Sequence, residues 1–330
     1  MKRRAIVRLG GSAVLVASLP VPVLGLKQQR IARIGILSSY SPANAGAAST
    51  WAAFYAELGL RGWVEGRNLT LVGRYTEGHP NRDATYADEL VAARVELILA
   101  TNSGAVTAAR KATSAIPIVM VNVSHAVETG FVASLARPSG NVTGVTNQAG
   151  DMQGKFVELV RSVRPDIRRI GVVWSPDNFG SALGFEGAQA VARSLEISVL
   201  SLPASRPSDL EHLLPTALRE GVQGLIVHPT PAIVPTWRMI QAWAIDHKVV
   251  TLGQAQWVRG GFLMSYWART SDLYRMAATF VDRILRGATP ADLPVEQPTR
   301  FELVINLKTA KALGLSIPQA LRLRADEVIE

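Results

Sequence analysis

Short apolar runs alternate along most of this chain with segments of helical period. The first run covers residues 31–37, and residues 47–60 then place Trp51, Phe54 and Leu58 on one helical face. Two further runs, 97–100 and 118–121, are apolar at every position, as expected for strands whose two faces are both covered by helices. This rhythm predicts parallel β-sheets with helices on both sides, which is the doubly wound α/β class.

The length of the chain indicates two such sheets. It has 330 residues, of which 48% are hydrophobic and 18% charged, and this suffices for two buried cores. A turn-rich segment, 137–141, interrupts the pattern, and the next strand leads through Asn147 toward a helix that starts near Asp151. We therefore expect the first crossing between two lobes there. The other strand candidates are 69–74, 142–145, 170–174, 198–202, 224–227, 249–252, 263–266 and 301–305.

Residues 1–25 have the composition of a leader peptide. A basic start precedes a stretch that is apolar apart from Arg8 and contains Pro20 and Pro22, which makes it shorter than the roughly 20 clean residues of a bilayer span. We predict cleavage near Gly25, after ordinary secretion or twin-arginine export, and an uncleaved anchor is the alternative. The sequence has no cysteine, so a lipid cannot be attached through one. An exported protein without that anchor is retained most simply by an outer membrane, and we expect a periplasmic location.

Charge and motif content argue against several other functions. Loss of the leader lowers the formal net charge from +9 to +5, and the remaining basic residues are spread along the chain, so nucleic-acid binding is not expected. The densest basic run, 161–169, is interrupted by Asp166 and is typical of a solvated face. The five histidines are scattered without metal-ligand spacing, and we expect no metal and no cofactor. They are His79, His125, His212, His228 and His247.

Enzymatic motifs are absent from the sequence. It has no GxxxxGK(S/T), no GxGxxG after a strand, no GxSxG and no HExxH. Adjacent acids such as Asp88 and Glu89 point in different directions on a helix, which suits solvation better than acid and base catalysis. We expect that the protein is not an enzyme, and an exported α/β enzyme stays the alternative.

Motifs spread over nearly the whole chain after the leader resemble one family. They cover residues 59–68, 112–119, 134–138, 140–144, 263–266, 272–275, 296–298, 301–306, 309–315, 317–318 and 325–328. The sequence is similar there to bacterial ABC-transporter substrate-binding proteins, from the group that includes tryptophan and tyrosine receptors. The resemblance implies the type 1 periplasmic binding-protein fold, in which two Rossmann-like lobes are joined by three crossing segments. It also implies a division into an N-terminal lobe, 31–147 plus 261–290, and a C-terminal lobe, 148–260 plus 291–330.

The same resemblance implies a function and partners. A monomer would hold a small-molecule ligand, such as an amino acid or a related carboxylate, between the two lobes. It would deliver this ligand to an ABC permease in the inner membrane. A solute sensor that signals to a membrane receptor is the alternative, because binding would look identical in the two cases.

Loops that follow the predicted strands are the candidate walls of a ligand site, because ligands of open α/β sheets bind beyond the carboxyl ends of strands. Residues 101–104 are the sharpest candidate, since a helix N-terminus there can bind a carboxylate or simply be capped by these side chains. Tyr40 can stack on a flat ligand or belong to a polar turn, and Asp177 can pair with an ammonium or cap a helix. The full candidate set is Ser39, Tyr40, Thr101, Asn102, Ser103, Ser124, His125, Asn147, Asp177, Asn178, Phe179, Pro229, Thr230, Gln254, Gln256 and Ser265.

The sequence also differs from that family in the number of acidic residues at one predicted loop. Members of the family often have acids near Gln256 and Arg259, and this chain keeps neither. We therefore expect a ligand with less positive charge than the ligands of relatives whose clefts are acidic.

Overall fold

The computed structural model describes residues 30–44, 46–147, 152–230 and 233–330 of the chain. The structural statements that follow concern these residues alone. The predicted leader, 1–25, lies outside them, as does the expected helix start at Asp151.

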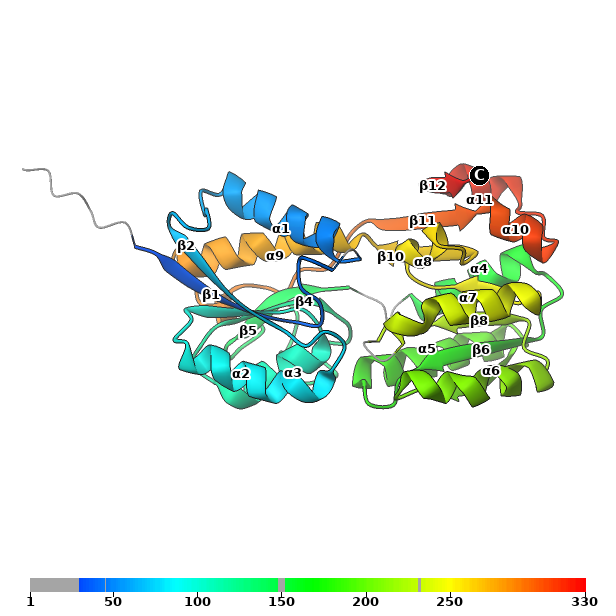
Figure 1. Cartoon of the computed structure of the whole chain (residues 1–330), viewed down its shortest axis with the longest axis horizontal. Helices are drawn as coiled ribbons and strands as arrows, with labels where there is room; N and C mark the ends of the chain where they lie inside the picture. Colours follow the sequence, from blue (N-terminus) through cyan, green and yellow to red (C-terminus); the bar gives the residue numbers. More distant parts are fainter. Residues whose placement is uncertain (1–29, 45, 148–151, 231–232) are drawn as a thin grey trace, which may run out of the picture. The chain divides into compact units, whose positions relative to one another are not determined.

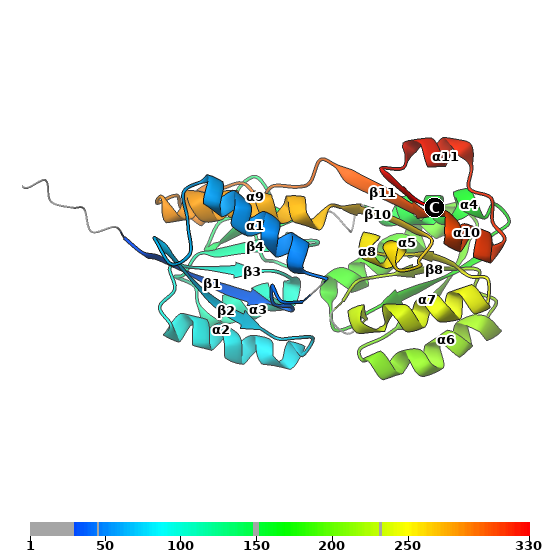
Figure 2. The ribbon, with the colours of Figure 1, turned by 45° about the horizontal axis from the view of Figure 1, so that its top comes forward.

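The first sheet has five strands in the order β2-β1-β3-β4-β5, and every pair of neighbours is parallel. Helices α1 and α9 lie side by side on one face, and α2 and α3 cover the other (Figures 1 and 2). We call this sheet with its four helices the first lobe. Its strands are β1 Ala32–Ser38, β2 Leu69–Tyr75, β3 Leu97–Ala100, β4 Ile118–Val123 and β5 Val142–Thr146, and its helices are α1 Ala48–Leu60, α2 Asp83–Ala92, α3 Ser103–Ala112 and α9 Thr270–Leu285.

The second sheet has seven strands in the order β12-β11-β10-β9-β8-β6-β7. Its neighbours are parallel except β10 and β11, which run antiparallel because the chain leaves the second sheet after β10 and re-enters it at that same end, where Phe301 pairs with Ala268. We call this sheet with its helices the second lobe. Its strands are β6 Arg169–Trp174, β7 Ser198–Pro203, β8 Gly224–Val227, β9 Val250–Leu252, β10 Met264–Ala268, β11 Phe301–Asn306 and β12 Glu327–Ile329. Its helices are α4 Gln153–Val163, α5 Phe179–Ser194, α6 Leu210–Arg219, α7 Trp237–Asp246, α8 Ala255–Arg259, α10 Leu307–Leu313 and α11 Gln319–Arg324.

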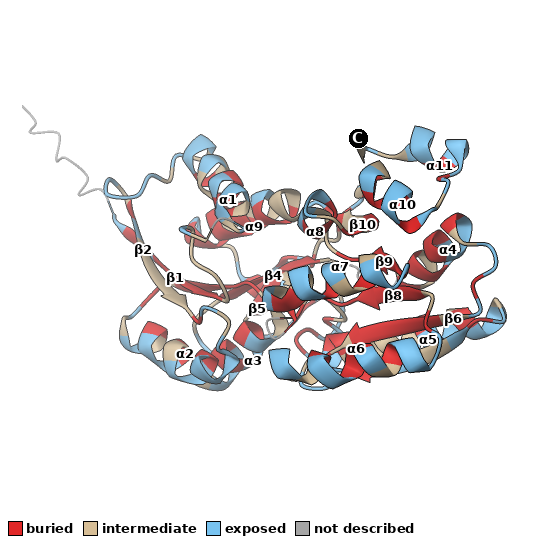
Figure 3. Cartoon of the chain, turned by 45° about the vertical axis from the view of Figure 1, so that its right-hand side comes forward, coloured by how far each residue is buried: buried red, intermediate tan, exposed pale blue. Residues whose placement is uncertain are grey.

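Each sheet is the buried middle layer of its lobe. In Figure 3 the central strands are coloured as buried, whereas the helices are buried on the side that faces the sheet and exposed on the other. The two faces of the first sheet carry separate apolar clusters, one built around Trp51 and Phe54 and the other around Leu90 and Ile98. Two more clusters cover the faces of the second sheet, around Phe156 and Trp257. These layers are the reason that strands such as β3 are apolar at every position.

The chain crosses between the lobes three times. The first crossing lies between β5 and α4, and the second lies at Arg269, between β10 and α9. The third follows a short 3-10 turn, Pro290–Asp292, after which Glu296 bridges to Val145 of the first sheet before β11 enters the second. The predicted class, two doubly wound α/β lobes joined by three crossing segments, is confirmed.

The expectation that residues 261–290 all belong to the first lobe needs one correction. Strand β10 pairs with β9 and β11, so it is part of the second sheet. Within this range the first lobe holds α9, which packs against α1, β4 and β5, and the turn at Pro290, which contacts β5. The crossing therefore falls at Arg269 and not near Gly261, and the remaining boundaries of the two lobes stay a prediction.

The predicted strands agree closely with the structure. The eleven apolar runs correspond to β1 through β11, with ends that differ by one or two residues, whereas β12 was not predicted. None of the helices within the described ranges is long and apolar enough to span a membrane.

Candidate functional site

A cavity of about 740 Å³ is lined by residues of both lobes. The first lobe contributes the segment before α1 and the loops after β3, β4 and β5, whereas the second contributes the loops after β6, β8 and β9. In each sheet the strand order reverses direction, between β1 and β3 and between β6 and β8. The loops at such a reversal diverge to opposite faces and leave a crevice between them. The cavity therefore lies where the topology of both sheets provides a binding crevice, and its volume is in the range of small-molecule sites.

Two helices of the cavity wall begin with an asparagine cap. The Oδ1 atom of Asn102 accepts a hydrogen bond from the Ala105 N–H at 2.9 Å, and Oδ1 of Asn178 accepts one from the Ser181 N–H, also at 2.9 Å. The capping roles predicted for these loops are thus confirmed for α3 and α5. Each cap satisfies one of the N–H groups that a helix start leaves free, and it holds the positive end of the helix dipole at the cavity.

Amide side chains line the junction between the lobes. Asn147, which follows β5, donates from Nδ2 to Oδ1 of Asn122 at 3.1 Å. Gln153 lies at the start of α4 and Gln254 at the start of α8, and both line the cavity. Because a carboxamide both donates and accepts, this part of the wall can bind polar groups of either kind.

A hydrogen-bonded chain fixes the wall of the second lobe around His228. The Ser175 N–H donates to Oγ of Ser181 at 3.1 Å, and that hydroxyl lies 3.2 Å from Nδ1 of His228. The other ring nitrogen, Nε2, lies 3.2 Å from Oε1 of Gln153. Burial lowers the pKa of His228 to about 4, and nearby His125 acts in the same direction. The ring is therefore neutral at pH 7, and this arrangement fits a tautomer that donates from Nε2 and accepts at Nδ1.

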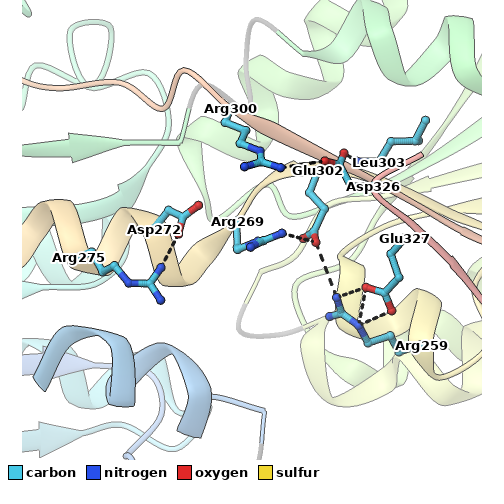
Figure 4. Close-up of polar contacts among 9 residues, drawn as sticks. All are labelled: Arg259, Arg269, Asp272, Arg275, Arg300, Glu302, Leu303, Asp326 and Glu327. Atoms are coloured by element: carbon cyan, nitrogen blue, oxygen red, sulfur yellow. Dashed lines mark hydrogen bonds and ion pairs between the residues drawn. The ribbon is translucent and has the colours of Figure 1, made fainter. Parts of the chain in front are cut away.

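The charged residues of the cavity wall pair with one another (Figure 4). Arg269 lies in the second crossing and donates to Oε1 of Glu302 at 2.9 Å. Arg259 holds Glu327, with Nε to Oε1 at 3.0 Å, and this hydrogen bond lowers the pKa of the Glu327 carboxyl. The same guanidinium reaches Glu302 at 4.0 Å. These two positive and two negative charges leave that side of the wall with no net charge.

Aromatic rings complete the wall near the crossing. Trp267 of β10 lines the cavity and packs against Phe156 with ring centroids 5.1 Å apart. Tyr274 of α9 also lines it and packs edge-on against Trp51 at 5.2 Å. The cavity therefore combines polar strand-end loops with an apolar surface that a flat or aliphatic part of a ligand can contact.

The structure brings most of the predicted site residues together. Those that line the cavity are Asn102, Ser103, Ser124, Asn147, Asn178, Pro229, Thr230, Gln254 and Gln256. Two others, Asp177 and Phe179, line a second cavity. Their contact with a ligand stays a prediction.

Five predicted residues line neither cavity. Ser265 is fully buried within β10. Thr101 is also buried, and its hydroxyl donates to Ser38 Oγ at 2.8 Å. Ser39 contacts a residue of the cavity wall and not the cavity itself, because its hydroxyl accepts a hydrogen bond from Nδ2 of Asn102 at 3.0 Å. The carbonyl of Tyr40 binds the indole of Trp51, so this loop folds back on α1. At His125 the carbonyl accepts the N–H and the hydroxyl of Thr129, which begins a turn that leads away.

Sequence reasoning missed the residues that the crossings bring to the cavity. They are Gln153, Trp267, Arg269, Thr270, Ser271, Tyr274 and Glu302. Glu327, which was also missed, reaches the cavity from β12. In the sequence, these residues are marked only by their position close to the ends of predicted strands next to a crossing.

Comparison with known proteins assigns the family. The model of a family described as ABC transporter substrate binding protein matches residues 54–329. The chain belongs to this family. A tyrosine-binding protein of Clostridioides difficile (strain R20291) is 25% identical to this substrate-binding protein over 276 residues, which cover 83% of this chain and 78% of that protein.

Solved structures share the fold. A Streptococcus pneumonia ABC domain in complex with L-Trp superposes with a TM-score of 0.83 at 24% identity and covers 91% of this chain and 100% of its own. A conserved domain protein of Vibrio cholerae gives 0.84 at 22% identity with the same coverage. These likenesses show that the two-lobed α/β fold is shared with both structures.

The two lobes approach each other closely at Gly180, near the start of α5. A Cβ atom placed there would lie 2.4 Å from Oγ of Ser124, which follows β4 in the first lobe. We expect Gly180→Leu to weaken ligand binding by about tenfold or more, because its side chain holds the lobes apart, while helix propensity keeps the fold stable. Titration of the ligand against both proteins measures the effect.

A matched control is Gly59→Leu, because Gly59 also lies in a helix and has nothing within 4 Å of its added Cβ. It should bind as the wild type does. The double variant Gly180→Ala/Ser124→Gly removes the obstructing hydroxyl and should bind better than Gly180→Leu. Unchanged affinity in Gly180→Leu would show that the lobes need not approach at this point.

Proposed function

We propose that this substrate-binding protein is the solute-binding component of an ABC importer. It binds a small solute, an amino acid or a related carboxylate, in the cavity of about 740 Å³, and the two lobes close around it. The family and the ligands named for the tyrosine-binding relative and the L-Trp complex support this proposal. In the importer, the closed form would dock on a permease of the inner membrane.

The observation that carries the proposal is the origin of the cavity wall. Both lobes contribute polar strand-end groups to one cavity, including Asn102 and Ser103 from the first lobe and Asn178 and Thr230 from the second. A ligand that contacts both lobes stabilises the closed state selectively, whereas a ligand bound to one lobe alone does not. The starts of α3 and α5 offer the partial positive charge of their helix dipoles to a carboxylate.

The test is a thermal-shift screen of the protein without its predicted leader against amino acids, organic acids and sugars. A ligand present at 100 times its dissociation constant stabilises the fold by about 2.7 kcal/mol, which such a screen detects readily. We expect stabilisation by at least one amino acid or carboxylate. If none of these solutes stabilises the protein, or if one is chemically converted by it, the proposal fails.

The importer role is separable from binding itself. Loaded protein should stimulate ATP hydrolysis by its permease and ATPase in reconstituted membranes, whereas a solute sensor would not.

We further propose that the protein is a periplasmic monomer without enzymatic activity. Light scattering of the purified protein measures its oligomeric state, and a dimer would contradict that part of the proposal.

A further inference from the structure

A second cavity, of about 700 Å³, lies on the other side of the helix starts that line the first. The first lobe lines it with the beginnings of α2 and α3, and the second lobe lines it with the loop before α5. Both cavities share the same four wall residues, Asn102, Ser103, Asn178 and Thr230. The two cavities therefore adjoin at these residues.

Asp83 is the unusual residue of this second cavity. It is the first residue of α2, its side chain is 9% exposed, and Oδ1 is buried without a hydrogen-bond partner in the described part of the chain. A Cβ atom at Gly104 would come within 2.9 Å of Oδ2. Glycine at this position therefore gives the carboxylate room beside the first turn of α3.

No ion pair compensates the charge of Asp83 among the described side chains. The other charged residues of the cavity wall, Lys111, Glu128 and Asp177, are exposed, and none of them forms a salt bridge with it. An ionised carboxylate in a dry site is costly unless a cation or hydrogen bonds accompany it. The geometry thus leaves a negative charge at the cavity that a ligand can satisfy.

The second lobe contributes a hydroxyl to the same cavity. Thr230 is 4% exposed, and its Oγ1 atom is buried and has no partner among the described residues. A hydroxyl oxygen can accept a hydrogen bond from an ammonium group. The two unsatisfied oxygens come from different lobes, so a group bound by both would favour closure.

We propose that the second cavity binds the positively charged end of the transported solute, a primary ammonium group, between the Asp83 carboxylate and the Thr230 hydroxyl. This inference rests on the proposed function, because it assigns a chemical class to one end of the same ligand. Burial raises the pKa of Asp83 to about 6, so the carboxylate is ionised at pH 7.5. The inference replaces the sequence-based expectation of a less cationic ligand, which considered residues 254–259 and not Asp83.

The experiment compares solutes that differ in charge and little in size. Lysine is titrated against 6-hydroxynorleucine, and putrescine against 1,4-butanediol, at constant ionic strength and pH 7.5. The wild type should bind the ammonium member of each pair about tenfold or more tightly, as expected for a hydrogen-bonded charge in a partly dry site. Asp83→Asn should remove that preference and leave the affinity for the neutral member unchanged within about twofold.

A matched control and a second variant make the result specific. Asp88→Asn removes an exposed carboxylate from α2 that lies outside both cavities, and it should keep the preference. Thr230→Val, which is nearly isosteric, should weaken binding of the ammonium solutes alone. The inference is overturned if neither ammonium solute binds the wild type, or if Asp83→Asn retains the preference. Stabilisation by any other solute in the thermal-shift screen would leave the proposed function standing in either case.

Discussion

Replacement of Gly144 by alanine is expected to lower the free energy of unfolding by about 4 kcal/mol or more. Gly144 lies in β5 with φ at +135°, and a Cβ atom there would be 2.1 Å from the carbonyl oxygen of Met120 and 2.8 Å from its nitrogen. Both contacts are with backbone of the paired strand β4, so the clash can be relieved only by moving the sheet. Urea denaturation followed by circular dichroism measures the loss.

Gly140 provides a control that distinguishes the steric clash at Gly144 from the strain of a positive φ alone. Gly140 also has a positive φ, +69°, but nothing lies within 4 Å of an added Cβ, so Gly140→Ala should cost only about 1 kcal/mol. The Gly144 carbonyl accepts the Glu296 N–H at 2.9 Å, which ties the third crossing to the first lobe. Gly144→Ala should therefore also weaken ligand binding. Equal losses of stability in the two variants would contradict the packing described for β5.

Asp83→Asn is expected to stabilise the protein at pH 8, by at most about 3 kcal/mol, which corresponds to complete removal of the ionisation cost. Burial raises the pKa of Asp83 from 3.8 to about 6. Between pH 3.8 and about 6, the folded state therefore keeps a proton that the unfolded state has lost. Stability of the wild type therefore falls as the pH rises from about 4 through 6. The advantage of the asparagine variant should be full above pH 7 and should vanish below pH 4, as measured by urea denaturation across this range.

The contribution of His228 to stability depends on pH in the opposite direction from that of Asp83. Its pKa is lowered from 6.5 to about 4 by burial, so the unfolded state binds the proton first as the pH falls. The stability from a neutral His228 is full above pH 6.5 and is lost as the pH falls toward 4. In the wild type the two groups oppose each other, whereas Asp83→Asn should lose stability on acidification without compensation. A difference between the two proteins that does not vary with pH would show that the charge of Asp83 is not what matters.

Most of the fold could be predicted because local sequence determines it. Runs such as residues 224–227 must be strands with both faces covered, since no polar side alternates within them. The direction of β11 could not be predicted in this way, because it depends on where the chain re-enters the sheet. The short strand β12 contains Glu327 and is only partly buried, so it lacks the apolar signal that marked the others.

The candidate site was predictable to the extent that it follows strand ends. Asn102 and Asn178 cap helices directly after buried strands, and a polar residue in that context is visible from sequence. Arg269 and Glu302 meet only because β10 and β11 are antiparallel neighbours, with Trp267 opposite Glu302. Asp83 lies at a helix start that looks like an ordinary acidic first turn, and only its burial distinguishes it.

Closure of the two lobes around a solute is measured most directly by the distance between them. The chain contains no cysteine, so cysteines introduced at the exposed positions Asp88 on α2 and Gln189 on α5 can carry the only two spin labels. Pulsed electron paramagnetic resonance should give a distance distribution that shifts to shorter values when the solute found in the thermal-shift screen is added, and Gly180→Leu should reduce the shift. An unchanged distribution at saturating solute would contradict closure as the mechanism of this protein.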